Sequence, residues 1–297
     1  MRALVTGGAG FVGTNLIKRL LKDGHQVISV DNYSTGYRGN EQKGCKYYTA
    51  DVRDNFWDLS LTDQCEVSCG CEIGEVDVIF HLAALARIQP SIKNPEPPLE
   101  TNVMGTLKVL EYARKNNIQV IYSGSSTKHH GIFKSPYAWS KFGGEQLCEL
   151  YSKVYDLNTT ICRFYNVYGE HHIKSGEYAT VIGIFEEQFL KDKPLTITAD
   201  GEQRRDFTHI DDIVEALIRC VGKDYRAEEF ELGRGKNFSI NQIADMFGKD
   251  YPKKYIAERP GEYPSTLADF SNAEEKLDWK ATKDIEDYIT TWVKENK

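Results

Sequence analysis

The sequence predicts an α/β protein built on a doubly wound parallel sheet, with a second, smaller α/β domain. Short buried apolar runs alternate with helical segments over the first half of the 297 residues, and this alternation is typical of a parallel sheet with helices on both faces. Beyond Asn166, aromatic residues, prolines and loops become denser and the alternation weakens. We therefore expect domains at 1–165 and 166–297, with part of 204–227 packing back on the first.

The expected elements follow in a regular order. A first apolar run leads through a glycine-rich turn into a helix that reaches about residue 22, and a second run ends at Asp31. Together they make a βαβ unit. Two further helices are expected at 99–115 and 137–155, the second after Ser135-Pro136, a pair that favours a helix start. The six predicted strands are 3–5, 27–31, 45–48, 76–82, 119–122 and 159–164.

Composition and charge limit the function classes. Hydrophobic residues make up 40% and charged residues 27%, as in ordinary globular proteins. A net charge of −7 argues against a dedicated binder of nucleic acid or of anionic membranes, because both usually show a basic patch. The chain has no run of about 18 apolar residues, and its N-terminus has glycines where a signal peptide has its apolar region. We therefore expect a cytoplasmic protein.

Clusters of cysteine and histidine raise the question of a metal site. The cysteines number seven, and an odd number argues against a fully paired secreted framework. Cys65, Cys69 and Cys71 lack the paired C-x2-C spacing of common zinc modules, so free thiols in an inserted loop are expected. The histidine pairs at 129–130 and 171–172 have no other ligands at metal-like spacing, and could contact a sugar or have no role. No metal is predicted.

A glycine-rich turn joins the first strand to the first helix. Gly7, Gly10 and Gly13 are spaced as G-x-x-G-x-x-G, and Asp31 follows 18 positions after Gly13 at the end of the second strand. Glycines let the backbone approach a pyrophosphate, whose charge lies at the helix N-terminus. A tight turn without a ligand is the alternative. Asp31 can accept hydrogen bonds from a ribose diol and would repel a 2′-phosphate, so the sequence predicts NAD rather than NADP.

A tyrosine and a lysine lie four residues apart in the expected helix 137–155. Tyr137 and Lys141 then share one face, and the simplest interpretation is a surface tyrosine over a lysine stem. The context favours chemistry, because Ser125 follows an apolar run at the edge of the sheet where ligands bind. A nearby lysine and a positive nicotinamide ring would lower the pKa of Tyr137, about 10 when unperturbed, and make it a base.

Ten motifs, in order along almost the whole chain, resemble the extended short-chain dehydrogenase/reductase family. Within that family they are most similar to UDP-glucose and UDP-N-acetylglucosamine 4-epimerases. The resemblance implies a Rossmann-type domain that holds NAD and a smaller domain that holds the nucleotide sugar. The motifs are GGAGFVG at 7–13, DNYSTG at 31–36, AD at 50–51, HLAA at 81–84, NVMGT at 102–106, Ser125, Y-x3-K at 137–141, FYNVYG at 164–169, RRDF at 204–207 and RPGE at 259–262.

The resemblance also implies roles for individual residues. Tyr137 matches the catalytic base, Lys141 its partner on the nicotinamide ribose, and Ser125 an assisting hydroxyl. The expected cofactor-binding residues are Gly7, Gly10, Phe11, Val12, Gly13, Asp31, Asn32, Ser34, Gly36, Asp51, Val52, Leu82, Ala83, Ala84, Asn102, Tyr137 and Lys141. The expected substrate-binding residues are Ser125, Ser126, Asn166, Arg205, Arg259 and Thr266. Guanidinium groups bind phosphate through paired N–H bonds, which favours this role for the two arginines; a surface salt bridge is the alternative.

The implied activity is NAD-dependent 4-epimerisation of a UDP-hexose or UDP-N-acetylhexosamine by transient oxidation at C4. Thr266 stands where some of these epimerases carry a bulky tyrosine, and its small side chain leaves room for an N-acetyl group. The resemblance further implies a homodimer formed through two helices. The candidate apolar contacts are Leu107, Leu110, Tyr112, Leu147 and Leu150, which could equally face the chain's own sheet.

Other activities remain open at this point. The 4,6-dehydratases and decarboxylases of the family place an acidic residue soon after the catalytic Ser or Thr, whereas residues 125–129 read SSTKH. Dehydration is therefore disfavoured. A nucleotide-sugar 4-reductase could use the same Tyr and Lys. A catalytically silent module that binds NAD or a nucleotide sugar is the non-enzymatic alternative, but it would not need Ser125, Tyr137 and Lys141 all intact.

Overall fold

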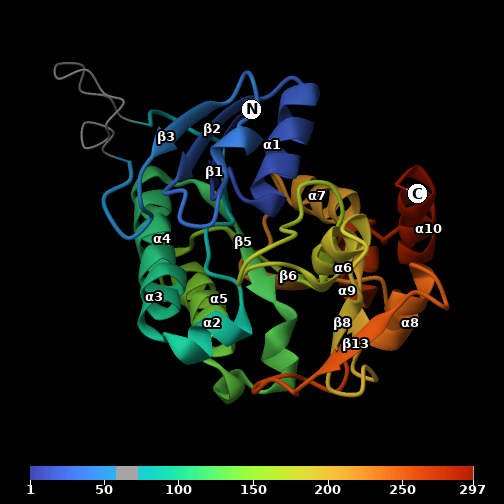
Figure 1. The fold of residues 1–297 in the computed structure, drawn as a ribbon. Helices are drawn as coiled ribbons and strands as arrows, with labels where there is room; N and C mark the ends of the chain where they lie inside the picture. The colour runs from blue at the N-terminus through green and yellow to red at the C-terminus, as the bar shows by residue number, and fades with distance from the viewer. Residues whose placement is uncertain (58–72, 297) are drawn as a thin grey trace.

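A seven-stranded parallel sheet forms the centre of the computed structural model, which describes residues 1–57 and 73–296 (Figure 1). The strand order is β3-β2-β1-β4-β5-β6-β11, and every neighbouring pair is parallel. The order reverses between β1 and β4, where doubly wound sheets bind ligands. The predicted fold class is confirmed. The strands are β1 (Arg2–Thr6), β2 (Gln26–Asp31), β3 (Lys46–Thr49), β4 (Val78–His81), β5 (Gln119–Ser125), β6 (Thr159–Phe164) and β11 (Glu228–Leu232).

Helices cover both faces of this sheet. On one face α1 (Phe11–Lys22) packs beside α7 (Ile210–Arg219), and Leu16 and Leu217 belong to one core with α9 (Ser271–Leu277). On the other face α4 (Gly105–Asn116) packs beside α5 (Pro136–Tyr155), and Leu110 and Cys148 belong to a second core. Figure 1 shows α4 and α5 on the opposite side of the sheet from α1 and α7. The sheet is thus held between two apolar layers.

The six predicted strands are all present, with ends that shift by a few residues. The helix expected over 137–155 is α5: Ser135 Oγ accepts the backbone N–H of Ala138 over 3.1 Å, and Pro136 occupies the first turn. The helix expected over 99–115 is present as one continuous helical run, made of α3 (Glu96–Leu99), a π-helical turn at Glu100–Met104 and α4. The short helix α2 (Ile88–Lys93) precedes it.

A third apolar core lies in the C-terminal part of the chain and includes Phe185, Phe247 and Ile289. Between these elements the chain returns to the central sheet through α7 and β11. The division into domains 1–165 and 166–297 stays a prediction. The remaining elements are β7 (Val167–Tyr168) with β10 (Thr208–His209), β9 (Arg204–Asp206) with β12 (Asn237–Ser239), β8 (Leu195–Thr198) with β13 (Lys253–Ile256), α6 (Val181–Leu190), α8 (Ile240–Met246) and α10 (Ile285–Glu295).

In each histidine pair, at least one ring contacts a glutamate. His129 Nε2 contacts Glu231, and His172 Nε2 lies 2.8 Å from Glu186 Oε2. Over residues 1–57 and 73–296, no cluster of three or more side chains is arranged to hold a metal ion. The prediction of free thiols at Cys65, Cys69 and Cys71 lies outside the described residues.

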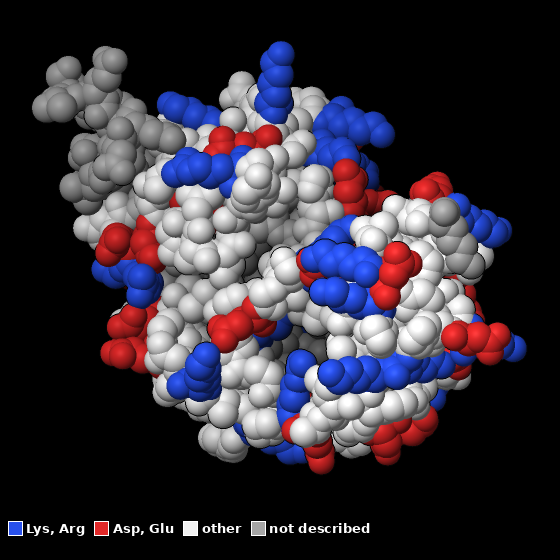
Figure 2. Space-filling model, viewed as in Figure 1, with Lys and Arg blue, Asp and Glu red and all other residues white. Residues whose placement is uncertain are grey.

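Basic and acidic side chains are interspersed on the face drawn in Figure 2, which is hollowed near its centre. None of the helices in the described ranges is long and apolar enough to cross a lipid bilayer.

Candidate active site

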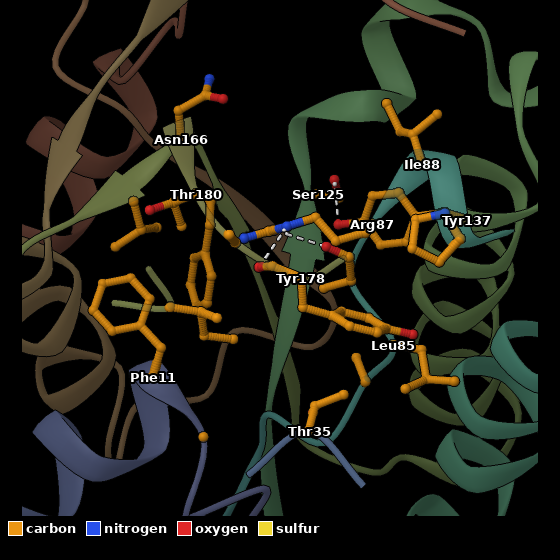
Figure 3. A pocket seen from close by; sticks show the side chains of 18 of the residues that line it. Phe11, Thr35, Leu85, Arg87, Ile88, Ser125, Tyr137, Asn166, Tyr178 and Thr180 are labelled. Atoms are coloured by element: carbon orange, nitrogen blue, oxygen red, sulfur yellow. Dashed lines mark hydrogen bonds between the residues drawn. The ribbon is translucent and has the colours of Figure 1, made fainter. Parts of the chain in front are cut away.

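A cavity of about 950 Å³ opens at the carboxyl ends of β1, β4 and β5. Its wall combines residues from both halves of the chain: the glycine-rich turn, the loop after β4 and the start of α5 on one side, and 166–182, Arg205 and 259–266 on the other. Figure 3 shows Phe11, Tyr137, Tyr178 and Asn166 around this space. Its volume suits ligands of the size of a cofactor and a substrate.

The glycine-rich turn fits a bound diphosphate. Gly7 has φ +75°, and a Cβ there would lie 2.8 Å from the backbone nitrogen of Ala83. A Cβ at Gly13 would overlap the carbonyl oxygen of Gly7 and lie 2.7 Å from Gly8 Cα. Only glycine allows this packing, which brings the N-terminus of α1 to the cavity wall. Free N–H groups at a helix N-terminus favour a phosphate group there.

Asp31 is the last residue of β2, and its carboxylate accepts hydrogen bonds from the glycine-rich turn and from the loop after β2. One carboxylate oxygen accepts the N–H of Ala9 over 2.9 Å and the other accepts the N–H of Tyr33 over 2.8 Å. Burial raises the pKa of Asp31. A carboxylate has about four acceptor sites, so two are left for a ribose diol. With the glycine-rich turn, this donor and acceptor set fits an NAD molecule.

Tyr137 and Ser125 meet at the cavity wall. Ser125 is the last residue of β5 and Tyr137 lies in the first turn of α5. The Tyr137 hydroxyl donates to Ser125 Oγ over 3.3 Å, as Figure 3 shows. Ser125 Oγ also accepts the hydroxyl of Thr127 over 3.0 Å. The twelve-residue separation in sequence therefore closes into a direct contact at the sheet edge.

Lys141 is buried beside these groups, but its ammonium points elsewhere. It donates to Ser123 Oγ over 3.4 Å and lies 4.4 Å from the centre of the Tyr122 ring. Burial lowers the pKa of Lys141 to about 8. Burial also raises the pKa of Tyr137, while the Ser125 hydrogen bond and the charge of Arg87 lower it. The expectation that Lys141 lowers the pKa of Tyr137 stays a prediction, and in this structure the ammonium is hydrogen-bonded to Ser123.

Glu145 accepts a hydrogen bond from the backbone of Ser125, a contact that the sequence did not lead us to expect. Its carboxylate accepts the backbone N–H of Ser125 over 3.2 Å, and Arg163 donates to it over 3.1 Å from Nε and 2.9 Å from Nη2. Arg163 Nη2 also pairs with Glu229 on β11. The available signal was the i,i+4 spacing from Lys141, which places Glu145 on the same face of α5.

Most of the predicted site residues do come together, since all but three line the cavity. The three exceptions lie just behind the wall. A Cβ at Gly36 would lie 2.9 Å from the Asp31 carboxylate, and Asp51 accepts a hydrogen bond from Asn32 over 2.7 Å. Asn102 Oδ1 accepts the N–H of Leu85 over 2.8 Å, which fixes the loop after β4. The binding roles of all these residues stay predictions.

The two predicted phosphate-binding arginines differ in their surroundings. Arg205 is buried, and its guanidinium donates to the carbonyl of Tyr263 over 2.7 Å and to Glu262 over 2.8 Å. Arg259 lines the cavity and is exposed. Asn166 Nδ2 donates to the carbonyl of Asp206 over 3.1 Å. Of these three residues, Arg259 brings an exposed positive charge to its side of the cavity, whereas Arg205 is paired with Glu262 and Asn166 is neutral.

Arg87 is a further cavity residue that the sequence reasoning missed. It follows β4 and reaches across the cavity, where its Nε donates to the carbonyl of Tyr178 over 2.9 Å (Figure 3). Its second contact is with the carbonyl of Ala86, over 2.8 Å from Nη1. The available signal was an arginine six residues beyond His81, the last residue of a strand whose carboxyl end faces the ligand.

Comparison with known proteins agrees with the fold and the cavity described above. Residues 3–233 match the model of the NAD dependent epimerase/dehydratase family. A putative UDP-glucose 4-epimerase from Methanocaldococcus jannaschii is 32% identical, with 99% of this chain and 98% of that protein covered. A UDP-glucuronate 4-epimerase from Thermodesulfobacterium geofontis is 33% identical, with 99% and 96% covered.

A solved structure agrees over the whole length. The UDP-glucose 4-epimerase of Thermotoga maritima, in complex with UDP-glucose, superposes with a TM-score of 0.87 at 30% identity, with 99% of this chain and 98% of that chain covered. The similarity therefore includes the C-terminal elements as well as the central sheet. The chain belongs to the NAD-dependent epimerase/dehydratase family, a family of enzymes whose cofactor is NAD.

Proposed function

We propose that this protein is a UDP-sugar 4-epimerase that oxidises its substrate transiently at C4, with Tyr137 as the acid/base. The contact of Tyr137 with Ser125, 3.3 Å long, carries the proposal, because it puts a phenol and a hydroxyl on the wall of a cavity that a glycine-rich turn also lines. The family and the names of its 4-epimerase relatives support the same reaction class.

Each residue has its own task in this mechanism. Tyr137 takes the proton of the sugar 4-hydroxyl and later returns it, while Ser125 Oγ holds that hydroxyl by a hydrogen bond. The glycine-rich turn and Asp31 would hold NAD, whose nicotinamide would supply reversible hydride transfer at C4. Lys141 orients the nicotinamide ribose. Because burial opposes ionisation of the Tyr137 phenol, the Ser125 bond and the positive charge of Arg87 are needed to keep its pKa down.

The two ligands divide the cavity between them. NAD occupies the side of the glycine-rich turn and Asp31, and the nucleotide sugar occupies the side of Asn166, Arg205 and Arg259. Thr266 Oγ1 accepts the N–H of Asp206 over 3.1 Å, so its side chain is turned towards the backbone. This orientation supports acceptance of an N-acetyl group at C2. UDP-glucose and UDP-N-acetylglucosamine are the proposed substrates.

The acidic residues of the wall favour epimerisation over dehydration. Among the described lining residues, the carboxylates are Asp31, Glu177 and Glu262. Glu177 pairs with Lys93 and Glu262 pairs with Arg205. Beside Ser125 the wall carries the neutral Ser126 and Thr127. A carboxyl group placed to protonate a leaving hydroxyl at C6 would be expected next to Ser125 in a dehydratase.

Turnover of a panel of UDP-sugars tests the proposal. Wild-type protein is expected to interconvert the C4 epimers of UDP-glucose, UDP-N-acetylglucosamine or UDP-glucuronate, followed by NMR, with no net change in absorbance at the NADH band, because the cofactor is regenerated in each cycle. Stoichiometric consumption of NAD(P)H would identify a 4-reductase. Binding of UDP-sugars without any turnover would identify a silent binding module, and either result would reject the proposal.

We propose that the protein is a homodimer joined through α5 and the helical turn before α4. Of the candidate contacts, Leu110 and Tyr112 are buried in the chain's own core, whereas Leu150 is 49% exposed. Met104, in the turn before α4, and Val154, in α5, are also exposed large apolar residues, and contiguous exposed apolar surface marks association sites. Sedimentation should give twice the chain mass of 33.8 kDa, and Val154→Lys should shift the protein to a single copy. Monomeric wild-type protein would contradict this.

We also infer a cytoplasmic location. The described cysteines, Cys45, Cys148, Cys162 and Cys220, are free thiols, as is usual in a reducing compartment. Fractionation of cells that express the tagged protein would place it in the soluble fraction if this is right, and in the periplasmic or secreted fraction if it is wrong.

A further inference from the structure

Arg87 brings a positive charge into the cavity, and no described carboxylate forms an ion pair with it. Its described contacts are the carbonyls of Tyr178 and Ala86, and the charged and polar groups that influence its pKa are the phenols of Tyr137 and Tyr178. The nearby carboxylates are engaged elsewhere, Glu177 with Lys93 and Glu262 with Arg205. Two N–H bonds to carbonyls leave three of the five guanidinium N–H groups for other partners.

Without a ligand, this placement of the Arg87 guanidinium costs free energy. Arg87 is partly buried, and this loss of water lowers the pKa of its guanidinium. Arg205 shows the contrast within the same wall, since its guanidinium is already neutralised by Glu262. A partly buried charge with open donors is satisfied once an anion binds beside it. Arg87 is therefore prepared for an anionic group that arrives with a ligand.

The position of Arg87 limits which ligand brings the anion. The side chain starts near Tyr137 and reaches towards Tyr178 across the open part of the cavity (Figure 3). Asn102 holds the backbone of Leu85 by two hydrogen bonds of 2.8 and 3.1 Å, so the loop that carries Arg87 is fixed. The guanidinium thus lies on the path between the acid/base and the proposed nucleotide-sugar side.

We propose that Arg87 binds an anionic oxygen group of the nucleotide sugar. The inference rests on the proposed function. Two parts of such a ligand share the required chemistry: the diphosphate, and a carboxylate at C6 of a uronic acid. Both present paired oxygens that a guanidinium binds in a bidentate manner.

Binding measurements on the NAD-loaded protein separate the two sources. Dissociation constants for UDP, UDP-glucose and UDP-glucuronate are measured by calorimetry for wild type and for Arg87→Met. The variant is expected to bind about 10- to 100-fold more weakly each ligand whose anionic group contacts the guanidinium in wild type. Equal weakening of all three ligands assigns the diphosphate, and weakening confined to UDP-glucuronate assigns the carboxylate. Arg87→Lys, which keeps the charge but not the fork, is expected to fall between the two.

Lys22→Met is the matched control, since it removes one positive charge from an exposed lysine in the last turn of α1 that does not line the cavity. Its affinities should stay within about twofold of wild type. Unchanged affinities in Arg87→Met, an equal loss in the control, a loss for both UDP-sugars but not UDP, or a loss of NAD alone would each overturn the proposal. Wild-type protein that neither binds nor converts a UDP-sugar would reject the proposed function itself, whereas normal wild-type turnover with intact Arg87→Met binding rejects only the role of Arg87.

Discussion

Replacement of Tyr137 by phenylalanine is expected to lower kcat by about 10²- to 10⁴-fold, the usual contribution of a general acid/base. The change removes only the hydroxyl, whose described partner is Ser125 Oγ. The Ser125 hydroxyl still accepts the hydrogen bond from Thr127, and the Ser125 backbone N–H still donates to Glu145. The fold and the cavity should therefore persist. Steady-state kinetics with UDP-glucose, together with the NAD content of the purified variant, measure the effect.

A second phenol on the same helix provides the control for Tyr137→Phe. Tyr155 lies at the C-terminal end of α5 and is 49% exposed, so Tyr155→Phe should leave kcat unchanged. Both variants should melt within a few degrees of wild type. Turnover by Tyr137→Phe at the wild-type rate would remove the phenol from the mechanism, whatever its effect on binding.

Gly13→Ala is expected to cost most of the bound NAD and to destabilise the fold. The added Cβ would overlap the carbonyl oxygen of Gly7 and lie 2.7 Å from Gly8 Cα, and both contacts are with backbone that cannot rotate away. The glycine-rich turn must open to accommodate the methyl group, which moves its N–H groups away from the diphosphate. Overpacking of this kind costs about 1–3 kcal/mol of stability. NAD released on denaturation and urea unfolding curves measure the two effects.

Gly143→Ala controls for the loss of a glycine as such. Gly143 is inside α5, and a Cβ there would meet side-chain atoms, the nearest being Val103 Cγ2 at 3.3 Å. Alanine is the better helix former, so stability should stay close to that of wild type. NAD content should be unaffected. A Gly13→Ala protein with full NAD content and an unchanged unfolding curve would show that the turn does not need glycine at this position.

The central sheet was predictable because its strands are continuous apolar runs, and parallel strands buried on both faces have this local pattern. The exception is β11, whose sequence EEFEL reads as a charged surface segment. Its glutamates are satisfied by partners distant in sequence: Lys128 and Arg163 bind Glu229, and Tyr165 donates to Glu231 over 2.8 Å. A strand at the edge of a sheet can carry such residues once those partners are in place, and a local pattern does not reveal them.

The candidate site also has residues that the sequence predicts and residues that it does not. The glycine-rich turn, Ser125 and Tyr137 were predictable because each belongs to a short motif at a strand end or a helix start. Arg87 was not, because its partner is the backbone of Tyr178, 91 residues away. The direction of the Lys141 ammonium was also beyond prediction, since Ser123 and Tyr122 reach it from β5. Spacing along a helix shows which residues share a face, but not what the neighbouring elements present to them.

The carboxylate behind Ser125 belongs to a group of side chains whose charges balance only as a set. Three carboxylates face two permanent cations, and the set becomes neutral when the histidine carries a proton. Its members are Glu145, Glu229, Glu231, Arg163, Lys128 and His129. Loss of one cation leaves an anion uncompensated in the group behind Ser125, and such a change is strongly destabilising. In related sequences, substitutions at these six positions should therefore occur together, so that the edge strand β11 and the proposed catalytic serine evolve as one electrostatic unit.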